Sequence, residues 1–233
     1  MNVIKRLWEE RSAIRYLYQT IYFNFHYLPF KHAIKLPIYV HKMKMHSMRG
    51  TISIEAERVY RGMVRLGFHD VSLYPNNGIV WDNHGGRVVF RGTCAIGNDS
   101  YISIGKHATI EFGDKFVASA SWRCVSFRGI TFGEAVRFGW ECLIFDTNFH
   151  PLFDIEKQQF RKASSPIIIG AHNWFGAQCK IMHGTVTPER CIFSLGTIVT
   201  RHCEKESYCV MGGNPVKVLT RNVMRIIDQD DEE

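Results

Sequence analysis

His150 is the residue in this 233-residue sequence whose setting best suits acid–base chemistry. It stands near the end of the string Ile144–Pro151, where a regular pattern of the sequence stops. A histidine at the mouth of a loop can act as a general base near neutral pH, because its unperturbed pKa of about 6.5 leaves much of it uncharged. Asp146 or Asn148 would orient its ring by accepting the Nδ1–H. The alternative is a structural or solvated histidine, since such pairs also occur for structural reasons.

The pattern that stops at His150 is a six-residue repeat. Between Phe132 and Pro215, short blocks open with a large apolar residue, often followed by Gly, and carry a small residue four places later. A period of six fits neither a lone helix nor a two-residue strand alternation, but it fits a coil of three short faces whose corners recur every sixth residue. The blocks therefore predict the rungs of a parallel β-helix. They open at Phe132, Phe138, Ile169, Phe175, Ile181 and Phe193.

The segment from His150 to Pro166 has no six-residue phase, and the repeat resumes at Ile167. In a solenoid each coil contacts only its neighbours, so an insertion must leave the stack as a surface loop, and such loops often carry function. We therefore expect an excursion at residues 151–165 within a β-helix domain of residues 51–220.

Residues 1–50 form a basic, aromatic N-terminal arm. They hold nine Lys or Arg against Glu9 and Glu10, whereas the other 20 basic and 20 acidic residues balance. Apolar residues at steps of three, four and seven predict an amphipathic helix over residues 3–28 that Pro29 ends, followed by an irregular stretch. The apolar stripe either packs on the β-helix or a neighbouring subunit, or it lies in a membrane interface with the basic side chains on anionic lipid.

The net charge of +7 comes from this arm. Such a charge favours an anionic surface such as membrane lipid, and because no nucleic-acid motif accompanies it, we expect no nucleic-acid partner. Residues 221–233 are expected to form an acidic C-terminal tail.

The sequence contains seven cysteines and no CxxC pair. Those on the small-residue place of a rung are expected to be core residues rather than metal ligands or nucleophiles. Unpaired thiols imply a reducing compartment. With no secretory signal pattern and no apolar run near the ~20 residues of a spanning helix, we expect a cytoplasmic protein. If the apolar stripe of the arm lies in a membrane interface, the protein would be peripheral at the inner face of the plasma membrane. The rung cysteines are Cys94, Cys142, Cys179 and Cys191.

Together, the ladder and four strings resemble the hexapeptide-repeat acyltransferases. The order and spacing of the strings match over roughly residues 90–220, and the combination is specific where each string alone is weak. The stretch Tyr22–Pro37 further resembles the capsular and surface-polysaccharide O-acetyltransferases. The four strings are Asp146–Pro151, Asn173–Ala177, Ser194–Arg201 and Gly213–Val218.

The resemblance implies an all-β fold, a left-handed parallel β-helix with an N-terminal amphipathic helical segment. It also implies a homotrimer with sites between adjacent subunits, acetyl-CoA as co-substrate, no metal, and a sugar or polysaccharide-precursor acceptor. His150 would deprotonate the acceptor hydroxyl, which attacks the thioester directly. The positions that match cofactor-binding residues are Trp174, Gly176, Ala177, Leu195, Thr200, Arg201 and Lys217.

Other functions remain open at this point. An N-acetyltransferase acting on an amino sugar nucleotide would give a product stable to mild base, and a non-catalytic scaffold would keep the fold without the activity. A zinc hydratase resembling the γ-carbonic anhydrases needs three converging histidines, but the HxxxxH pair His41 and His46 lies outside the ladder. The family often places an Asn near the acceptor before the histidine, and residues 118–121 of this chain contain none.

Overall fold

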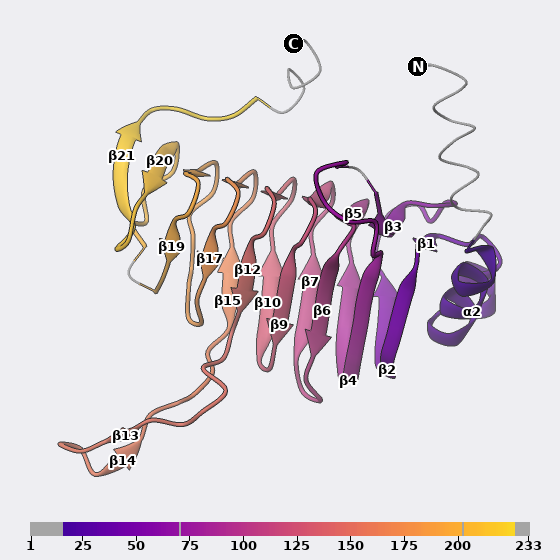
Figure 1. The fold of residues 1–233 in the computed structure, drawn as a ribbon, viewed down its shortest axis with the longest axis horizontal. Coiled ribbons are helices and arrows are strands. Elements are labelled where there is room, and N and C mark those ends of the chain that lie inside the picture. The colour runs from indigo at the N-terminus through magenta and orange to yellow at the C-terminus, as the bar shows by residue number, and fades with distance from the viewer. Residues whose placement is uncertain (1–15, 70, 202, 227–233) are drawn as a thin grey trace.

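The computed structural model describes residues 16–69, 71–201 and 203–226, which form a prism of stacked coils with a helix across one end (Figure 1). Within the stack, apart from its last pair of strands, the strands pair in parallel with the equivalent strands of the next coil. The fold is therefore a parallel β-helix, as the six-residue repeat predicted, with three faces that we number in the order in which the chain passes through them.

Face 1 is a single sheet that runs the length of the prism. Its last pair of strands is antiparallel and ends the stack. In stacking order the strands are β1 (Ile38–Val40), β3 (Val64–Phe68), β5 (Cys94–Gly97), β8 (Phe116–Ala118), β11 (Arg137–Phe138), β16 (Trp174–Phe175), β18 (Ile192–Phe193), β20 (Cys209–Gly212) and β21 (Lys217–Arg221).

Faces 2 and 3 belong to one sheet that folds at β4 (Ile79–Phe90). Residues 79–83 of β4 pair with face 2 and residues 87–90 with face 3, while β2 (Met43–Ile54) pairs with both halves. Face 2 continues through β6 (Ser100–Ile104), β9 (Arg123–Ser126), β12 (Leu143–Phe145), β17 (Lys180–Ile181) and β19 (Ile198–Val199). Face 3 continues through β7 (Thr109–Phe112), β10 (Gly129–Phe132) and β15 (Ile167–Ile169).

Two of the corners between faces matter for the site. The glycine corner joins face 1 to face 2 and includes Gly139 and Gly176, and the histidine corner joins face 2 to face 3 and leads to His150. A Cβ atom on Gly176 would lie 2.8 Å from the main-chain nitrogen of Leu195 on the next coil. Only glycine therefore permits this coil spacing, which gives Gly176 a structural role whatever else it does.

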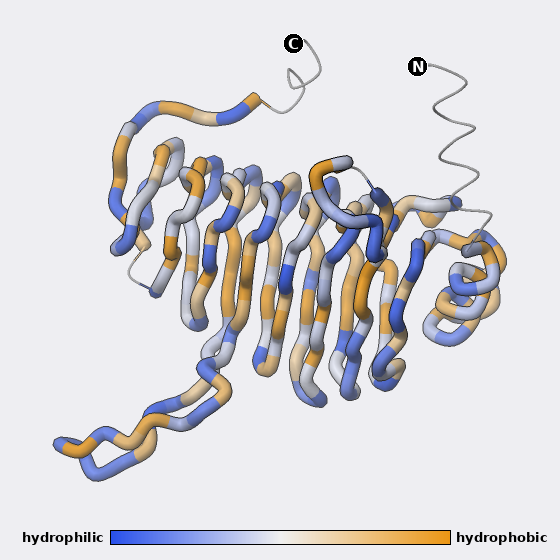
Figure 2. The backbone as a smooth tube through the Cα atoms, in the orientation of Figure 1, coloured by the Kyte–Doolittle hydropathy of each residue, from blue (hydrophilic) through white to orange (hydrophobic). Residues whose placement is uncertain are grey.

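The core is a column of apolar side chains inside the prism, and hydrophobic and hydrophilic segments alternate along the coils (Figure 2). All the block openings named above are buried, so the interpretation of the repeat is confirmed. The rings of Phe138, Phe175 and Phe193 stack on face 1 with centroids 4.5 Å apart. All seven cysteines are free and buried, and burial raises the pKa of the Cys94 and Cys124 thiols. The prediction that the rung cysteines are core residues is confirmed.

Helix α2 (Leu17–Tyr27) closes the first coil, and it ends before Pro29 as predicted. Residues 3–15 of the expected helix lie outside the described residues. The buried Asn24 side chain donates to the carbonyl of Ile38 at 2.6 Å and accepts from its N–H at 3.1 Å. Gln19 makes the same paired contact with Met43, at 2.9 and 3.1 Å. Because these amides bond an edge that has no preceding coil in the described part of the chain, α2 protects that edge from pairing with another strand.

The stretch 31–50 is regular, contrary to the sequence-based expectation. It contains most of α3 (Phe30–Ala33), all of β1 and the first part of β2, so the first coil begins at Ile38. The six-residue signature is missing there because β2 is twelve residues long and passes around a corner without a new block. None of the helices in the described part of the chain is long and apolar enough to cross a membrane.

Candidate active site

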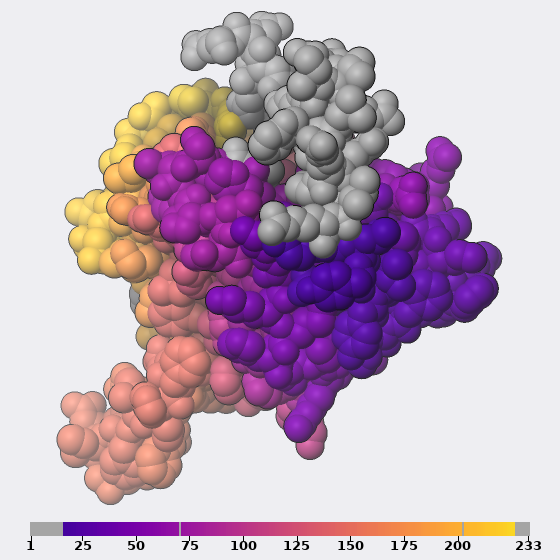
Figure 3. Space-filling model, turned by 45° about the vertical axis from the view of Figure 1, so that its right-hand side comes forward, coloured from indigo at the N-terminus to yellow at the C-terminus, as the bar shows by residue number. Residues whose placement is uncertain are grey.

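His150 stands where the chain leaves the stack. After β12 the main chain turns sharply: the N–H of Phe149 donates to Thr147 Oγ1 at 3.0 Å, and Phe149 has a φ of 60°. Residues 153–160 then form a hairpin of β13 (Phe153–Asp154) and β14 (Gln159–Phe160) that protrudes from the prism (Figures 1 and 3). The His150 side chain is exposed at the mouth of this excursion, where it is accessible from solvent.

The neck of the excursion is fixed by main-chain contacts. The N–H of Asn148 donates to the carbonyl of Ala163 at 2.7 Å, and that of Ser165 donates to the carbonyl of Asp146 at 2.9 Å. The N–H of Gly184, on the next coil, donates to Ser165 at 3.2 Å. The chain therefore leaves and re-enters the stack at one point, which fixes the main chain on both sides of His150.

Asp146 is fully buried, and its carboxylate accepts hydrogen bonds from the preceding coil. It accepts hydrogen bonds from the main-chain N–H groups of Phe127, Arg128 and Gly129, at 2.6, 2.8 and 2.7 Å, and from Ser126 Oγ at 2.9 Å. Within the described residues, no hydrogen bond joins the side chain of Asp146 or Asn148 to the His150 ring. Asp146 thus holds the turn of residues 126–129. Its connection to His150 is through the main chain, since its carbonyl bonds Ser165 in the neck of the excursion.

The hairpin has its own carboxylate. Asp154 accepts from the main-chain N–H of Lys157 at 3.1 Å and from Arg161 Nε at 3.0 Å. Both contacts lower the pKa of Asp154, and the hydrogen bond from the Lys157 N–H has the larger effect. The hairpin therefore has internal polar contacts of its own, while its apolar side chains Leu152, Phe153, Ile155 and Phe160 are exposed.

The residues predicted to bind the cofactor form two groups, and Lys217 lies apart from both. Trp174 lies on face 1, between Arg137 and Ile192 of the adjacent strands, and the Arg225 guanidinium lies 4.3 Å from its ring centroid. Gly176 and Ala177 follow at the glycine corner, and Leu195, 71% exposed, occupies the same corner one coil on. These residues form one continuous strip along one edge of the prism, which we call the Trp174 strip.

The second group lies on the histidine corner. The pairing of Ile144 with Ile181, and of Ile181 with Val199, puts Asp146, His183 and Arg201 at the same place in three successive coils. Thr200 and Arg201 therefore share the corner of His150. Lys217 is exposed on β21, opposite Gly212, at the end of the stack.

Face 2 separates His150 from Trp174 within the chain. Going along a coil from Trp174, the chain passes the glycine corner and strand β17 before it reaches the histidine corner. The two sets of predicted residues therefore lie on different edges of the same prism. One copy of the chain does not bring the proposed base and the Trp174 strip together.

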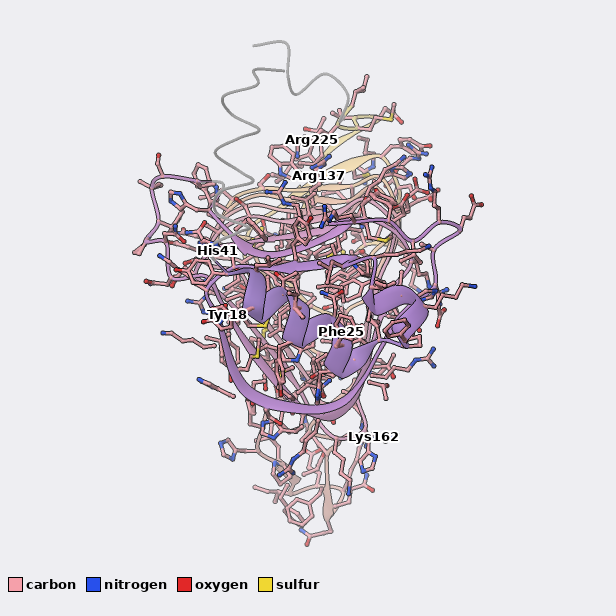
Figure 4. The ribbon with its side chains drawn as sticks, turned by 90° about the vertical axis from the view of Figure 1, so that its right-hand side faces the viewer. Tyr18, Phe25, His41, Arg137, Lys162 and Arg225 are labelled. Carbon is pink, nitrogen blue, oxygen red and sulfur yellow. The ribbon has the colours of Figure 1, made fainter. Side chains whose placement is uncertain are left out.

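A basic groove of about 600 Å³ lies on face 1 next to Trp174, and the sequence reasoning missed it. Its cations come from separate coils and from the C-terminal segment, and Figure 4 shows Arg137 and Arg225 near one another. Lys115 pairs with Glu134 at 3.5 Å. The groove could not be predicted from the sequence, because its basic residues are far apart along the chain and are brought to one surface only by the stacking of the coils. The basic lining consists of Arg65, Lys115, Arg137, His172, Arg190 and Arg225.

Metal-ligating groups do not converge in the described part of the chain: no three His, Cys, Asp or Glu side chains there are placed to hold a metal ion. Of the HxxxxH pair, His41 is buried and His46 is exposed.

Comparison with known proteins adds a relative in sequence and one in structure. The chain is 29% identical to the polysialic acid O-acetyltransferase of Escherichia coli O1:K1 / APEC over 125 residues, which is 54% of this chain and 38% of that protein. The crystal structure of the polySia-specific acetyltransferase NeuO matches with a TM-score of 0.51 and 18% identity, over 82% of this chain and 92% of NeuO. No protein-family model matches the chain. The fold is thus the left-handed parallel β-helix, and the chain resembles the hexapeptide-repeat acyltransferases, as its sequence predicted.

Proposed function

We propose that this protein transfers an acetyl group from acetyl-CoA to a hydroxyl of an acidic surface polysaccharide or its precursor. The observation that carries the proposal is the exposed His150 at the mouth of the excursion, in a chain that resembles a polysialic acid O-acetyltransferase. The aligned part spans 38% of that relative.

His150 is proposed to act as the general base. Its Nε2 takes the proton of the acceptor hydroxyl as the oxygen attacks the thioester carbonyl carbon. The carbon–sulfur bond then breaks, and the thiolate of CoA leaves with the electron pair and is protonated. No covalent bond to the protein forms, which fits a site whose cysteines are all buried. A base of this kind contributes about 10²–10⁴ in rate.

The glycine corner has the features that a pantetheine arm requires. Leu195 is exposed, and a Cβ atom on the neighbouring Gly196 would meet no atom within 4 Å, so the surface there is open. We assign the pantetheine contacts to the Trp174 strip, with Ala177 beside the thioester. The exposed cations Arg201 and Lys217 suit the phosphates, because each offers charge-assisted hydrogen bonds.

The separation of His150 from Trp174 supports a site shared between copies. We propose a homotrimer in which the histidine corner of one subunit faces the Trp174 strip of the next, since a closed ring of three repeats the same contact without leaving one unpaired. The seven free thiols support a reducing, cytoplasmic location.

The basic groove supports an anionic acceptor. The coils of Lys115, Arg137, His172 and Arg190 follow one another along the prism, at about 4.8 Å per coil. The groove therefore presents a row of basic side chains, which suits an extended polymer with repeated carboxylates. The groove borders the Trp174 strip through Arg137 and Arg225, so a chain bound there would run toward the proposed thioester position.

An acceptor panel tests this function. The full chain is given acetyl-CoA with polysialic acid, a neutral polysaccharide of similar length or an amino sugar nucleotide, and release of CoA thiol is followed. We expect release with polysialic acid and much less with the neutral polymer, and the transferred acetyl group should be removed by mild base because it is an ester.

Two outcomes of the panel favour the other functions. Turnover confined to the amino sugar nucleotide, with a base-stable product, would identify an N-acetyltransferase. Absence of saturable acetyl-CoA binding would indicate a scaffold without activity.

A further inference from the structure

The side of α2 that faces away from the prism, together with α3, carries an exposed apolar surface. We call it the cap face. Its residues lie on α2, on α3 and directly after α3, and they are exposed by 46–70%. Figure 4 shows α2 lying across the end of the prism, with Tyr18 and Phe25 labelled on it. The cap face consists of Tyr18, Tyr22, Phe25, Phe30 and Ile34.

Folding does not require these side chains to be apolar. The opposite side of α2 makes the contacts with the β-helix, through the buried residues Thr20, Phe23 and Asn24. The rings of Phe25 and Phe30 lie 6.1 Å apart, so the exposed aromatic surface is continuous from α2 to α3. A contiguous exposed apolar patch of this kind marks an interaction surface.

The charge around the cap face has a single sign. Residues 16–54, the first described stretch of the chain, contain five Lys or Arg and no Asp or Glu. Lys31 and Lys35 are exposed beside the aromatic side chains. Two copies of the chain meeting through this face would bring like charges together, whereas an anionic surface would be attracted to it.

The composition of the cap face agrees with a membrane surface. An interfacial helix lies in the plane of a membrane, with its aromatic side chains at the depth of the headgroups and its basic side chains on anionic lipid. Tyrosine suits this position because its ring is apolar and its hydroxyl stays hydrated.

We propose that the cap face docks on a bilayer containing anionic lipid, so that the prism stands on the membrane with its axis near the bilayer normal. The coil of His150 is the fifth along face 1, in the order β1, β3, β5, β8 and β11. At about 4.8 Å per strand, the proposed base lies ~20 Å from the capped end. An acceptor polymer held near the membrane would then meet the site at a fixed height, and the docking itself does not depend on acetyl transfer.

Vesicle co-sedimentation of the full chain tests the docking, with phosphatidylcholine vesicles compared with vesicles that also contain phosphatidylglycerol. We expect binding to the anionic vesicles that weakens as salt rises. Phe30→Ser should weaken it about tenfold, and Lys31→Gln about fivefold. The matched controls are Leu73→Ser, since Leu73 is 69% exposed against 70% for Phe30, and Lys106→Gln, a lysine exposed on the coils. Both should bind like the wild-type chain.

Three results would overturn the docking. One is absence of binding at any lipid composition, and another is equal loss of binding in the controls and the cap variants. The third is a concentration-dependent self-association, seen by sedimentation without lipid, that Phe30→Ser abolishes, since the cap face would then bind a second copy. Unfolding temperatures of all four variants, measured first, show that each is folded.

Discussion

Replacement of His150 by Ala is expected to lower the turnover of acetyl transfer by about 10²–10⁴, with the affinity for acetyl-CoA unchanged. The ring is exposed and makes no hydrogen bond within the described residues, so its loss disturbs no packing. The cofactor residues lie on other coils or another edge, which is why binding should survive. Initial rates of CoA release and a direct binding titration measure the two quantities separately.

His107→Ala is the matched control, since this histidine is also exposed on the stack, at the end of an earlier turn. It should retain wild-type turnover. If His150→Ala turns over like His107→Ala, another group is the base. If His150→Ala instead loses acetyl-CoA binding, the histidine has a role in binding the cofactor.

Replacement of Asp146 by Ala is expected to lower the free energy of unfolding by about 3–5 kcal/mol. The change removes a buried carboxylate and leaves the N–H groups of Phe127 and Gly129 and the Ser126 hydroxyl without their acceptor. Turnover should fall as well, because the main chain of Asp146 joins the neck that holds His150. Chemical denaturation followed by circular dichroism measures the loss.

Asp154→Ala is the control for this prediction. Asp154 also accepts main-chain and arginine hydrogen bonds, but it lies in the protruding hairpin, whose loss leaves the coils intact. We expect a smaller effect on unfolding of the stack. Equal stability of the two variants would contradict the role of Asp146 in holding the turn of residues 126–129.

The β-helix and its core could be predicted from the sequence because the repeat is local. Each block carries its own apolar opening, and Phe138, Phe175 and Phe193 stack because consecutive coils put the same position in register. Pro29 ended the N-terminal helix for an equally local reason, since its missing N–H and its ring are incompatible with a continuing helix.

The contacts that tie one coil to another could not be read in this way. Asp146 lies four residues from His150 in sequence, yet its carboxylate binds residues 126–129 on the preceding coil. The basic groove has the same origin, since Arg65 and Arg190 line one groove only when several coils are stacked. The first coil was missed because its stability depends on Asn24 and Gln19 of the capping helix rather than on a repeated block.

The central claim is that His150 of one copy serves acetyl-CoA bound on the Trp174 strip of another. Two variants measure it: His150→Ala, which lacks the base, and Ala177→Trp, whose larger side chain blocks the strip. Each alone should be inactive. Co-expressed with different tags and purified through both, mixed trimers should recover up to about a third of wild-type turnover, because one of the three sites in each mixed ring takes His150 from one variant and an open strip from the other. Mixed assemblies that remain inactive would contradict the claim.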